Sequence, residues 1–513
     1  MRIKTITWII TLAVLAAMGL PVRLAAQAQE DQKEQKTGHH HYKLIDIGTL
    51  GGPNSFAPWL FSLDINSRGL ATAEADTSIP DPFAPNCLQS TCLVNHAITS
   101  QNGVQTDLGA LPGGNNSSIA NWINDQGAVV GMSNNGVIDP LTGFPEFSAV
   151  LWQGGRILEL GTLGGNVSFA NAINNQGQVV GGALNSIPDG DATGLQFNPF
   201  PVATQFRAFL WQNGVMRDLG TLGSGNDAVA LFVNDRGQVA GLSYTDTVLN
   251  ADGIPTLDPF FWENGRMVDI GTLGGTLGTP FHMNSRGQVV GNSNVAGDQT
   301  SHAFLWDKEK GLKDLGTLPG RSVSLAIWIN EAGEIVGLDD FFNGGHGILW
   351  KNGKTIDLGT LPGDCSSEAV SINSQGQIVG NSSPDCSQDG AAVLWENGGA
   401  PVNLNTLVPP GSEFNVVFTV NINDRGEIAG DGVLPNGDVH AVLLIPCDEN
   451  HADVEGCDFD TVDAATAAQV HPAQTAPSAA ATSFSNVSPA ERKTRIRSMM
   501  AKRNGRFGAT PPK

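Results

Sequence analysis

Short apolar runs separated by tight polar turns recur along residues 42–446. In the clearest copy, the apolar runs cover residues 279–284, 288–291, 302–306 and 312–318. Runs this short, bounded by Gly and Asn, are typical of β-strands and are too short for stable helices. The pattern therefore predicts four β-strands in each copy of the unit.

One turn signal marks every copy of this unit. A quartet of the form Asn-x-x-Gly follows an apolar run eight times, and its asparagines are Asn66, Asn124, Asn174, Asn234, Asn284, Asn330, Asn373 and Asn423. The seven intervals span 357 residues and average 51, which is close to the length of a four-stranded propeller blade. The Asn side chain can bond to the backbone two residues on, and Gly accepts a positive φ, so each quartet predicts a tight hairpin.

The two ends of the repeat region predict how the sheet system is closed. Residues 44–50 are of the fourth-strand type but precede any first strand, and residues 440–445 are of the third-strand type with no fourth strand after them. We therefore expect an all-β, closed β-propeller of eight four-stranded blades, in which the N-terminal strand completes the last blade. Closure removes exposed sheet edges. The alternative, an open solenoid, requires polar caps at both ends.

The start of the sequence has the pattern of a secretory signal. Arg2 and Lys4 precede an apolar run at residues 6–20, and Ala26-Gln27-Ala28 is a small-residue cleavage pattern. We expect an extracellular or periplasmic protein with no transmembrane segment after cleavage. The predicted organisation is a signal peptide (1–28), a short polar segment (29–41), the propeller (42–446), a Cys-paired segment with an Ala/Ser/Thr/Pro-rich linker (447–487) and a basic tail (488–513).

Charge limits the partners of the propeller. The net charge of −22 repels phosphate backbones, so we expect no nucleic acid partner for the propeller. Residues 491–513 differ, because they hold eight Lys or Arg and one acid. Ser488, Pro489 and Glu491 form a helix start signal, and the tail that follows is a candidate for contact with an anionic envelope surface. The alternative is a solvated, disordered tail, since so short a helix is marginal alone.

Six cysteines form three local couples: Cys87 with Cys92, Cys365 with Cys386, and Cys447 with Cys457. Six cysteines allow 15 connectivities, so these disulfide pairings rest on proximity in the sequence. Metal binding is the alternative, but the spacing of zinc ligands is absent.

One segment resembles the opening of a calcium loop, with Asp189, Asp191 and Thr193 at alternate positions and a Gly at the sixth. Phe200 stands where the bidentate Glu is expected, so a simple turn is the alternative. We expect no other cofactor.

The units resemble the HAF repeats of a family of probable extracellular bacterial proteins. The triplet stands at His302-Ala303-Phe304, with variants beginning at His96, Arg207 and His440, and an Asp-Leu-Gly-Thr-Leu segment recurs beginning at Asp218, Asp314 and Asp357. The resemblance covers residues 42–446. It implies export and no established activity, so it assigns no catalytic residue.

Several recurring side chains are interpreted as scaffold. Six tryptophans stand at one strand position and are expected to pack between blades: Trp152, Trp211, Trp262, Trp306, Trp350 and Trp395. Four histidines share another repeat position and are expected to be structural hydrogen-bonding groups, not a metal site: His96, His302, His346 and His440. Asp339 and Asp340 are adjacent acids, but neighbours in a strand point to opposite faces, which argues against a hydrolytic pair.

The loops between second and third strands indicate where a ligand could bind. They are long in the first four blades, at residues 72–95, 132–147, 182–206 and 242–258, and short in the others. Long loops are often functional, although neutral loop growth explains them equally well. No nucleophile elbow, zinc-binding helix motif or phosphate loop occurs. We therefore expect a secreted binding module for an extracellular polymer, envelope component or protein. The alternatives are a polysaccharide hydrolase or lyase with acids at the channel mouth, and a structural repeat protein without a ligand.

Overall fold

The computed structural model describes residues 38–463 except 59–61, 90, 141, 190–203, 249–254, 341–343, 385, 387–389 and 397. The predicted signal peptide, linker and basic tail, together with Asp191 and Thr193, lie outside the described residues. The described part is an all-β protein whose helices are two short 3-10 turns, η2 (Leu404–Thr406) and η3 (Glu449–His451).

The strands form successive four-stranded antiparallel units. In chain order, the units are β3 (Gly51–Phe56), β4 (Ala71–Pro80), β5 (Leu93–Gln101) and β6 (Val104–Asp107); β7 (Ser118–Ile123), β8 (Val129–Ile138), β9 (Pro145–Gln153) and β10 (Arg156–Glu159); β11 (Gly164–Ile173), β12 (Val179–Pro188), β13 (Thr204–Gln212) and β14 (Val215–Asp218); β15 (Ala228–Val233), β16 (Val239–Tyr244), β17 (Leu257–Glu263) and β18 (Arg266–Asp269); β19 (Gly274–Met283), β20 (Val289–Val295), β21 (Ser301–Asp307) and β22 (Gly311–Asp314); β23 (Ser324–Ile329), β24 (Ile335–Asp339), β25 (Gly347–Lys351) and β26 (Lys354–Asp357); and β27 (Ser366–Ile372), β28 (Ile378–Ser383), β29 (Ala391–Trp395) and β30 (Val402–Asn403). The fourth and fifth units also share one parallel contact, Leu257 with Leu277.

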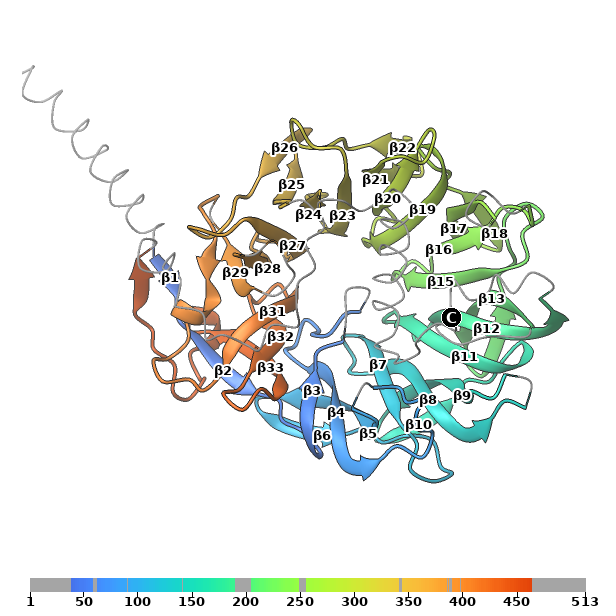
Figure 1. Cartoon of the computed structure of the whole chain (residues 1–513), viewed down its shortest axis with the longest axis horizontal. Coiled ribbons are helices and arrows are strands. Elements are labelled where there is room, and N and C mark those ends of the chain that lie inside the picture. The colour runs from blue at the N-terminus through green and yellow to red at the C-terminus, as the bar shows by residue number, and fades with distance from the viewer. Residues whose placement is uncertain are drawn as a thin grey trace, which may run out of the picture.

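The last unit uses both ends of the repeat region. β31 (Asn415–Ile422), β32 (Ile428–Val433) and β33 (Val439–Pro446) are completed by β2 (Tyr42–Asp46), which pairs with β33 in antiparallel register. This unit lies beside the first one, because Ala441 N donates to Ser55 Oγ at 3.0 Å. Figure 1 shows the units following one another around a common centre in a propeller-like arrangement. Beside them, β1 (Gly38–His40) pairs with β34 (Thr461–Asp463).

The strand boundaries differ from the prediction at two recurrent places. The fourth strand ends at the Asp of Asp-Leu-Gly-Thr-Leu, because that side chain accepts a hydrogen bond from the Gly backbone two residues on, as Asp314 does from Gly316 at 2.7 Å. The rest of the segment is therefore a link between units. The second strands β4, β8 and β12 run further than predicted, so the long loops are shorter than the sequence indicated.

The Asn-x-x-Gly turns join neighbouring units to each other. Within a turn, the Asn Oδ1 accepts from the backbone two and four residues on, as Asn66 does from Arg68 N and Leu70 N. The Nδ2 of the same Asn donates to the backbone carbonyl of the next Asn in the series. These bonds run from Asn66 to Asn124, Asn174, Asn234, Asn284, Asn330, Asn373 and Asn423 at 2.9–3.3 Å. Asn423 donates in turn to the carbonyl of Asn66 at 3.0 Å, which returns the series to its start.

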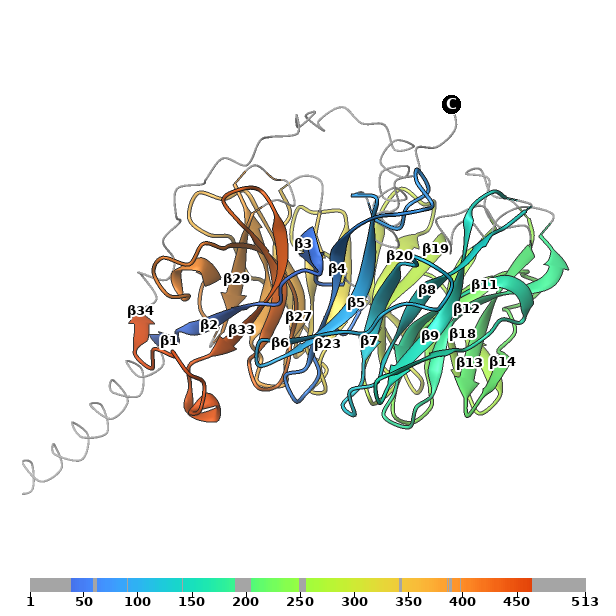
Figure 2. The ribbon, with the colours of Figure 1, turned by 90° about the horizontal axis from the view of Figure 1, so that it is seen from below.

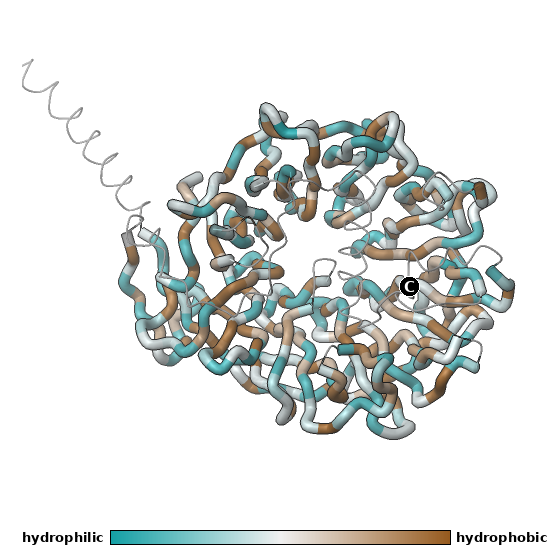
Figure 3. Tube along the Cα trace, viewed as in Figure 1, coloured by the Kyte–Doolittle hydropathy of each residue, from teal (hydrophilic) through white to brown (hydrophobic). Residues whose placement is uncertain are grey.

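Hydrophobic positions are spread through all the units, as Figure 3 shows. The recurring tryptophans are buried except Trp262, which is partly exposed. The indole Nε1 of Trp152, Trp350 and Trp395 donates to the carbonyls of Gly109, Leu315 and Leu358, in the links one unit earlier. Their position between units is therefore as predicted, and the hydrogen bonds satisfy the polar edge of each ring.

Aromatic side chains meet at the centre. Trp122 of the second unit packs edge-on against Phe232 of the fourth, with ring centroids 6.2 Å apart. His282 lies 5.9 Å from Phe232 and stacks on Trp328 at 3.7 Å. Since Trp122 and Phe232 belong to units that are not neighbours, they must reach towards the common axis.

Candidate functional site

Antiparallel meandering divides the turns between two faces. The hairpins that join first to second and third to fourth strands lie on one face, here called the hairpin face. The second-to-third loops and the links between units lie on the other, the long-loop face. Figure 2 shows the chain beyond β4 and β5 extending past the sheets on the long-loop face.

Lys and Arg are unevenly distributed between these faces. Of the fifteen Lys and Arg within residues 42–446, ten lie in or directly beside tight turns of the hairpin face: Arg68, Arg156, Arg236, Arg266, Arg286, Lys308, Lys310, Lys351, Lys354 and Arg425. The four long-loop segments hold ten acidic residues and no Lys or Arg. Five of these acids are buried: Glu74, Asp76, Asp81, Asp139 and Asp258. Glu146, Asp189 and Asp246 are partly exposed, so the described charges at the surface of these loops are acidic.

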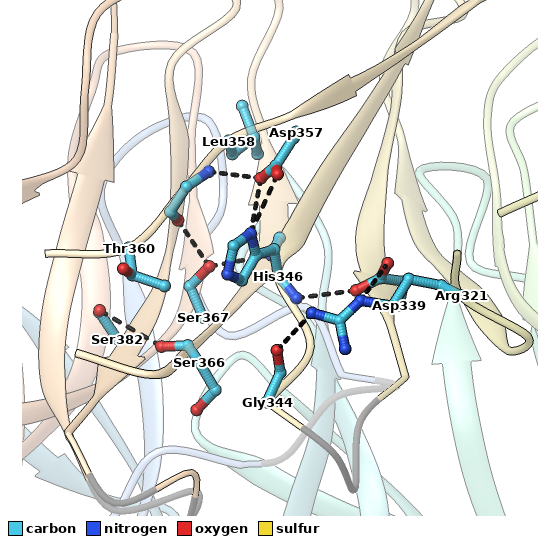
Figure 4. A network of polar contacts seen from close by, with 12 residues as sticks. Arg321, Asp339, Gly344, His346, Asp357, Leu358, Thr360, Ser366, Ser367 and Ser382 are labelled. Carbon is cyan, nitrogen blue, oxygen red and sulfur yellow. Dashed lines mark hydrogen bonds and ion pairs between the residues drawn. The ribbon is translucent and has the colours of Figure 1, made fainter. Parts of the chain in front are cut away.

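Arg207 reaches this face, where its Nη1 donates to Asn226 O at 3.3 Å. Arg321, in the link before β23, also reaches it (Figure 4). Its Nε lies 3.7 Å from Asp339 Oδ2, its Nη1 lies 3.6 Å from Asp340 Oδ2, and its Nη2 donates to Gly344 O at 2.9 Å. Asp339 is fully buried, and burial raises its pKa. Both carboxylates thus meet one guanidinium. The expectation that they point apart was wrong, because Asp340 follows the last residue of β24 and turns the chain with a φ of 35°.

The long loop of the first unit folds back on its own sheet. Residues 81–92 contain the disulfide between Cys87 and Cys92, and Leu88 packs in a cluster with Ile119 and Phe147 of the second unit. Gln89 donates to Glu74, and the Thr91 hydroxyl donates to Asp76 at 3.3 Å. The loop therefore covers the acidic end of β4.

Buried carboxyls gather where the last unit meets the first. Asp64, Glu74 and Asp431 are 0%, 8% and 4% exposed. Burial raises the pKa of Asp64 well above its usual range, and the charges of Asp431 and Glu74 act in the same direction, whereas the Ser62 hydroxyl lowers it. Asp431 accepts from the backbone of Ala57 at 2.8 Å. Within the described residues, no group of three or more His, Cys, Asp or Glu side chains has the arrangement of a metal site.

Exposed aliphatic side chains stand along the long-loop face of the first four units. We call Ile79, Val137, Ile138, Ile187 and Val248 the aliphatic rim. They stand at or just beyond the ends of the second strands, and their exposed fractions are 41–73%. An exposed Val or Ile is unremarkable alone, but repetition at one structural position over four successive units is typical of a contact surface.

The remaining predicted residues that the structure describes have structural partners. Asp189 accepts from Asn226 Nδ2 at 3.0 Å, so one of its oxygens holds a loop together. The disulfides Cys365–Cys386 and Cys447–Cys457 are formed, as is Cys87–Cys92.

The recurring histidines each lie beside an aspartate of a fourth strand. The pairs are His96–Asp107, His302–Asp314, His346–Asp357 and His440–Asp46, at 2.9–3.0 Å. They stand on separate outer strands and do not converge, as the sequence indicated. The aspartates could have been found from the same repeat pattern, because Asp107, Asp314 and Asp357 begin Asp-Leu-Gly segments and Asp46 begins the related Asp-Ile-Gly.

Comparison with known proteins finds distant structural likenesses. No family model and no curated protein matches the sequence. A mutant puromycin hydrolase matches 74% of this chain and 61% of its own length, so the chain spans less than two thirds of that enzyme, at 12% identity and a TM-score of 0.37. An oligogalacturonate lyase from Vibrio parahaemolyticus matches over 80% of this chain and 98% of its own, at 8% identity and a TM-score of 0.35. An ulvan lyase matches over 79% and 94%, at 8% identity and a TM-score of 0.33.

These likenesses are too distant to say anything about chemistry. In the part of the chain that the structure describes, no helix has the length and apolar character needed to cross a membrane.

Proposed function

We propose that the chain is an exported HAF-repeat protein that forms a closed eight-bladed propeller and works as an interaction module. Its recognition surface is the long-loop face of the first four units. Closure is supported by the series of Asn hydrogen bonds that returns from Asn423 to Asn66. The three disulfides suit an oxidising compartment.

The observation that carries the binding function is the aliphatic rim. Burying one such side chain against a partner contributes about 1.5–3 kcal/mol at most, so several together with surrounding polar groups suffice for specific binding. The histidines and Arg321 are already engaged with carboxylates of the scaffold. The partly exposed charged groups of the long loops are acids, namely Glu146, Asp189 and Asp246, which favours a partner with cationic and apolar groups.

A secreted hydrolase or lyase is the second candidate. The buried carboxyls Asp64, Glu74 and Asp431 favour it, because apposed acids with perturbed pKa values are characteristic of such enzymes. A polymer would have to displace the loop of residues 81–92 to reach Glu74. That requirement ranks the enzyme below the interaction module.

The test combines binding and turnover in one experiment. The mature protein is incubated with insoluble polysaccharides and cell envelopes, with calcium or a chelator, and both depletion from solution and release of soluble products are measured. A rim variant carries Val137→Ser, Ile138→Ser, Ile187→Ser and Val248→Ser. A matched outer-strand variant carries Val104→Ser, Leu158→Ser, Val215→Ser and Ile356→Ser, which are exposed residues of the fourth strands.

We expect depletion that the rim variant loses and the outer-strand variant keeps. Soluble products would reject the interaction module in favour of the enzyme. Depletion that both variants retain would place recognition away from the rim. No depletion and no products would favour the structural repeat protein.

A further inference from the structure

The long-loop face presents two complementary features to a partner. Its loops hold no Lys or Arg, and the half-buried acids Glu146, Asp189 and Asp246 belong to the same loops as the aliphatic rim. A cationic side chain gains from this field, and an apolar side chain gains from covering the rim. The matching occupant is therefore a segment that is both basic and amphipathic.

Such a segment is present in the same chain. Residues 488–513 carry eight Lys or Arg and one acid: Arg492, Lys493, Arg495, Arg497, Lys502, Arg503, Arg506 and Lys513, with Glu491. Ile496, Met499 and Met500 are spaced i, i+3 and i+4, which places them on one face of a helix. The start signal at Ser488 and Pro489 favours that helix, and an isolated helix of this length needs a surface to be stable.

The segment is long enough to reach the rim. The described chain ends at Asp463 in β34, and residues 464–487 connect this point to Ser488. These 24 residues span at most about 80 Å when extended. A body of roughly 400 residues has a radius of gyration of about 21 Å. A tether of this kind holds its segment at a local concentration on the order of millimolar, so even weak contacts become occupied.

We propose that residues 488–513 dock on the aliphatic rim and acidic loops of their own chain and cover the recognition face. The proposal rests on the function proposed above, because it gives that face its partner class: cationic amphipathic segments. An external ligand of the same class would compete with the tail. Docking combines charge attraction with apolar contact. Salt therefore weakens the charge attraction, while the apolar contact with the aliphatic rim is still required for binding.

The test uses a fluorescently labelled peptide of residues 488–513 and measures its anisotropy as protein is added. The proteins are the mature chain and the same chain ending at residue 487. We expect binding to the shortened chain, and at least about ten-fold weaker binding to the mature chain, whose tethered tail competes. Raising NaCl from about 0.05 to 0.5 M should weaken binding about ten-fold or more. In the shortened chain, the rim variant should lose binding and the outer-strand variant should keep it.

Four outcomes overturn the proposal. Equal affinity for the two chains rejects tail docking, and loss of binding in the outer-strand variant with retention in the rim variant rejects the rim. Peptide bound to vesicles containing phosphatidylserine but not to the shortened chain assigns the tail to a lipid surface. Oligomers that sedimentation detects in the mature chain and not in the shortened chain assign it to a second copy. If the shortened chain still captures ligands in a rim-dependent way, only this inference fails and the proposed function stands.

Discussion

Asp258 and Asp269 form a carboxyl pair at the position where other units pair His or Arg with Asp. The structural equivalents are His302–Asp314 in the next unit and Arg207–Asp218 in the previous one. Burial, followed by the charge of Asp269 and a weaker contribution from Asp246, raises the pKa of Asp258 to about 7. Asp258 is 7% exposed, so its charge is poorly solvated, and this pair holds a proton where the previous unit has the cation of Arg207.

The first prediction concerns the pH dependence of this pair. Asp258 has a higher pKa folded than unfolded, so between about pH 4 and 7 the folded state binds the extra proton. The contribution of Asp258 to the free energy of unfolding is therefore fully present below about pH 4 and is lost as pH rises to about 7. The total change is on the order of a few kcal/mol. Asp258→His restores the His–Asp pair and should gain melting temperature relative to the wild type as pH rises from 5 to 8.

His302→Asp is the reciprocal variant for this experiment, because it creates a second carboxyl pair, with Asp314, between β21 and β22. Its melting temperature should fall relative to the wild type over the same pH range. Parallel melting curves for all three proteins would reject the shared proton.

The contribution of His282 to stability should have the opposite pH dependence. Burial lowers its pKa to about 3, although a hydrogen bond with the backbone of Ile329 opposes this, and the neutral ring stacks on Trp328. The unfolded state binds a proton below about pH 6.5 and the folded state does not, so stability falls from pH 6.5 towards 3 by up to about 1.4 kcal/mol per unit. His282→Phe keeps the packed ring and should unfold at higher urea than the wild type at pH 4.5, relative to pH 7. An unchanged difference between the two pH values would show that His282 is already charged at pH 4.5.

The hydrogen bonds of the Asn-x-x-Gly turns predict that replacing one turn Asn by Ala lowers the stability of the fold substantially. Asn124→Ala removes the Oδ1 bonds to Gln126 N and Ala128 N and the Nδ2 bond to Asn174 O. Because Asn124 is buried, we expect a loss of about 2–4 kcal/mol in the free energy of unfolding, measured by urea denaturation. Asn213→Gly is the control, since Asn213 lies in a third-to-fourth hairpin with a φ of 52° that Gly adopts easily. Similar losses in both variants would mean that turn conformation, not the bond between units, determines stability.

The disulfides should differ in their contribution to stability. Cys365 and Cys386 are 21 residues apart, whereas Cys87 and Cys92 are five apart. In the loop-entropy model, removing the longer link costs about 1 kcal/mol more. Thermal unfolding of the two double Cys→Ala variants compares them. A larger loss for Cys87 and Cys92 would indicate that the packing of Leu88 depends on that disulfide.

The repeated sequence pattern allowed the strands and turns within each unit to be predicted. The contacts between different units did not follow from that pattern. The Asn-x-x-Gly quartets located the hairpins because the turn chemistry is contained in four residues. The second partner of each Asn lies about 50 residues away, so only the packing of neighbouring units reveals it. The meeting of Trp122 with Phe232 depends in the same way on the distance across the centre.

Loop length drew attention to the face that carries the aliphatic rim, and ligand binding there stays a prediction. The strands β4, β8 and β12 continue into the predicted loops, which alternation of apolar residues did not reveal. The opposing directions expected for Asp339 and Asp340 assumed a regular strand, and the positive φ of Asp340 breaks it. Chemistry that depends on one irregular residue is not visible in a repeat pattern.

The pairing of Gly38 with Asp463 places the two ends of the described chain next to each other. Each turn Asn donates its side-chain amide to the carbonyl of the Asn in the next unit around the series. None of these hydrogen bonds depends on which unit is synthesised first. A circular permutant could join residue 463 to residue 38 through a few glycines and begin and end in another link, such as residues 160–163. It would keep every one of these hydrogen bonds between units. The order in which the units are read from the gene is thus separable from their order in space, and circular permutants of this protein should fold.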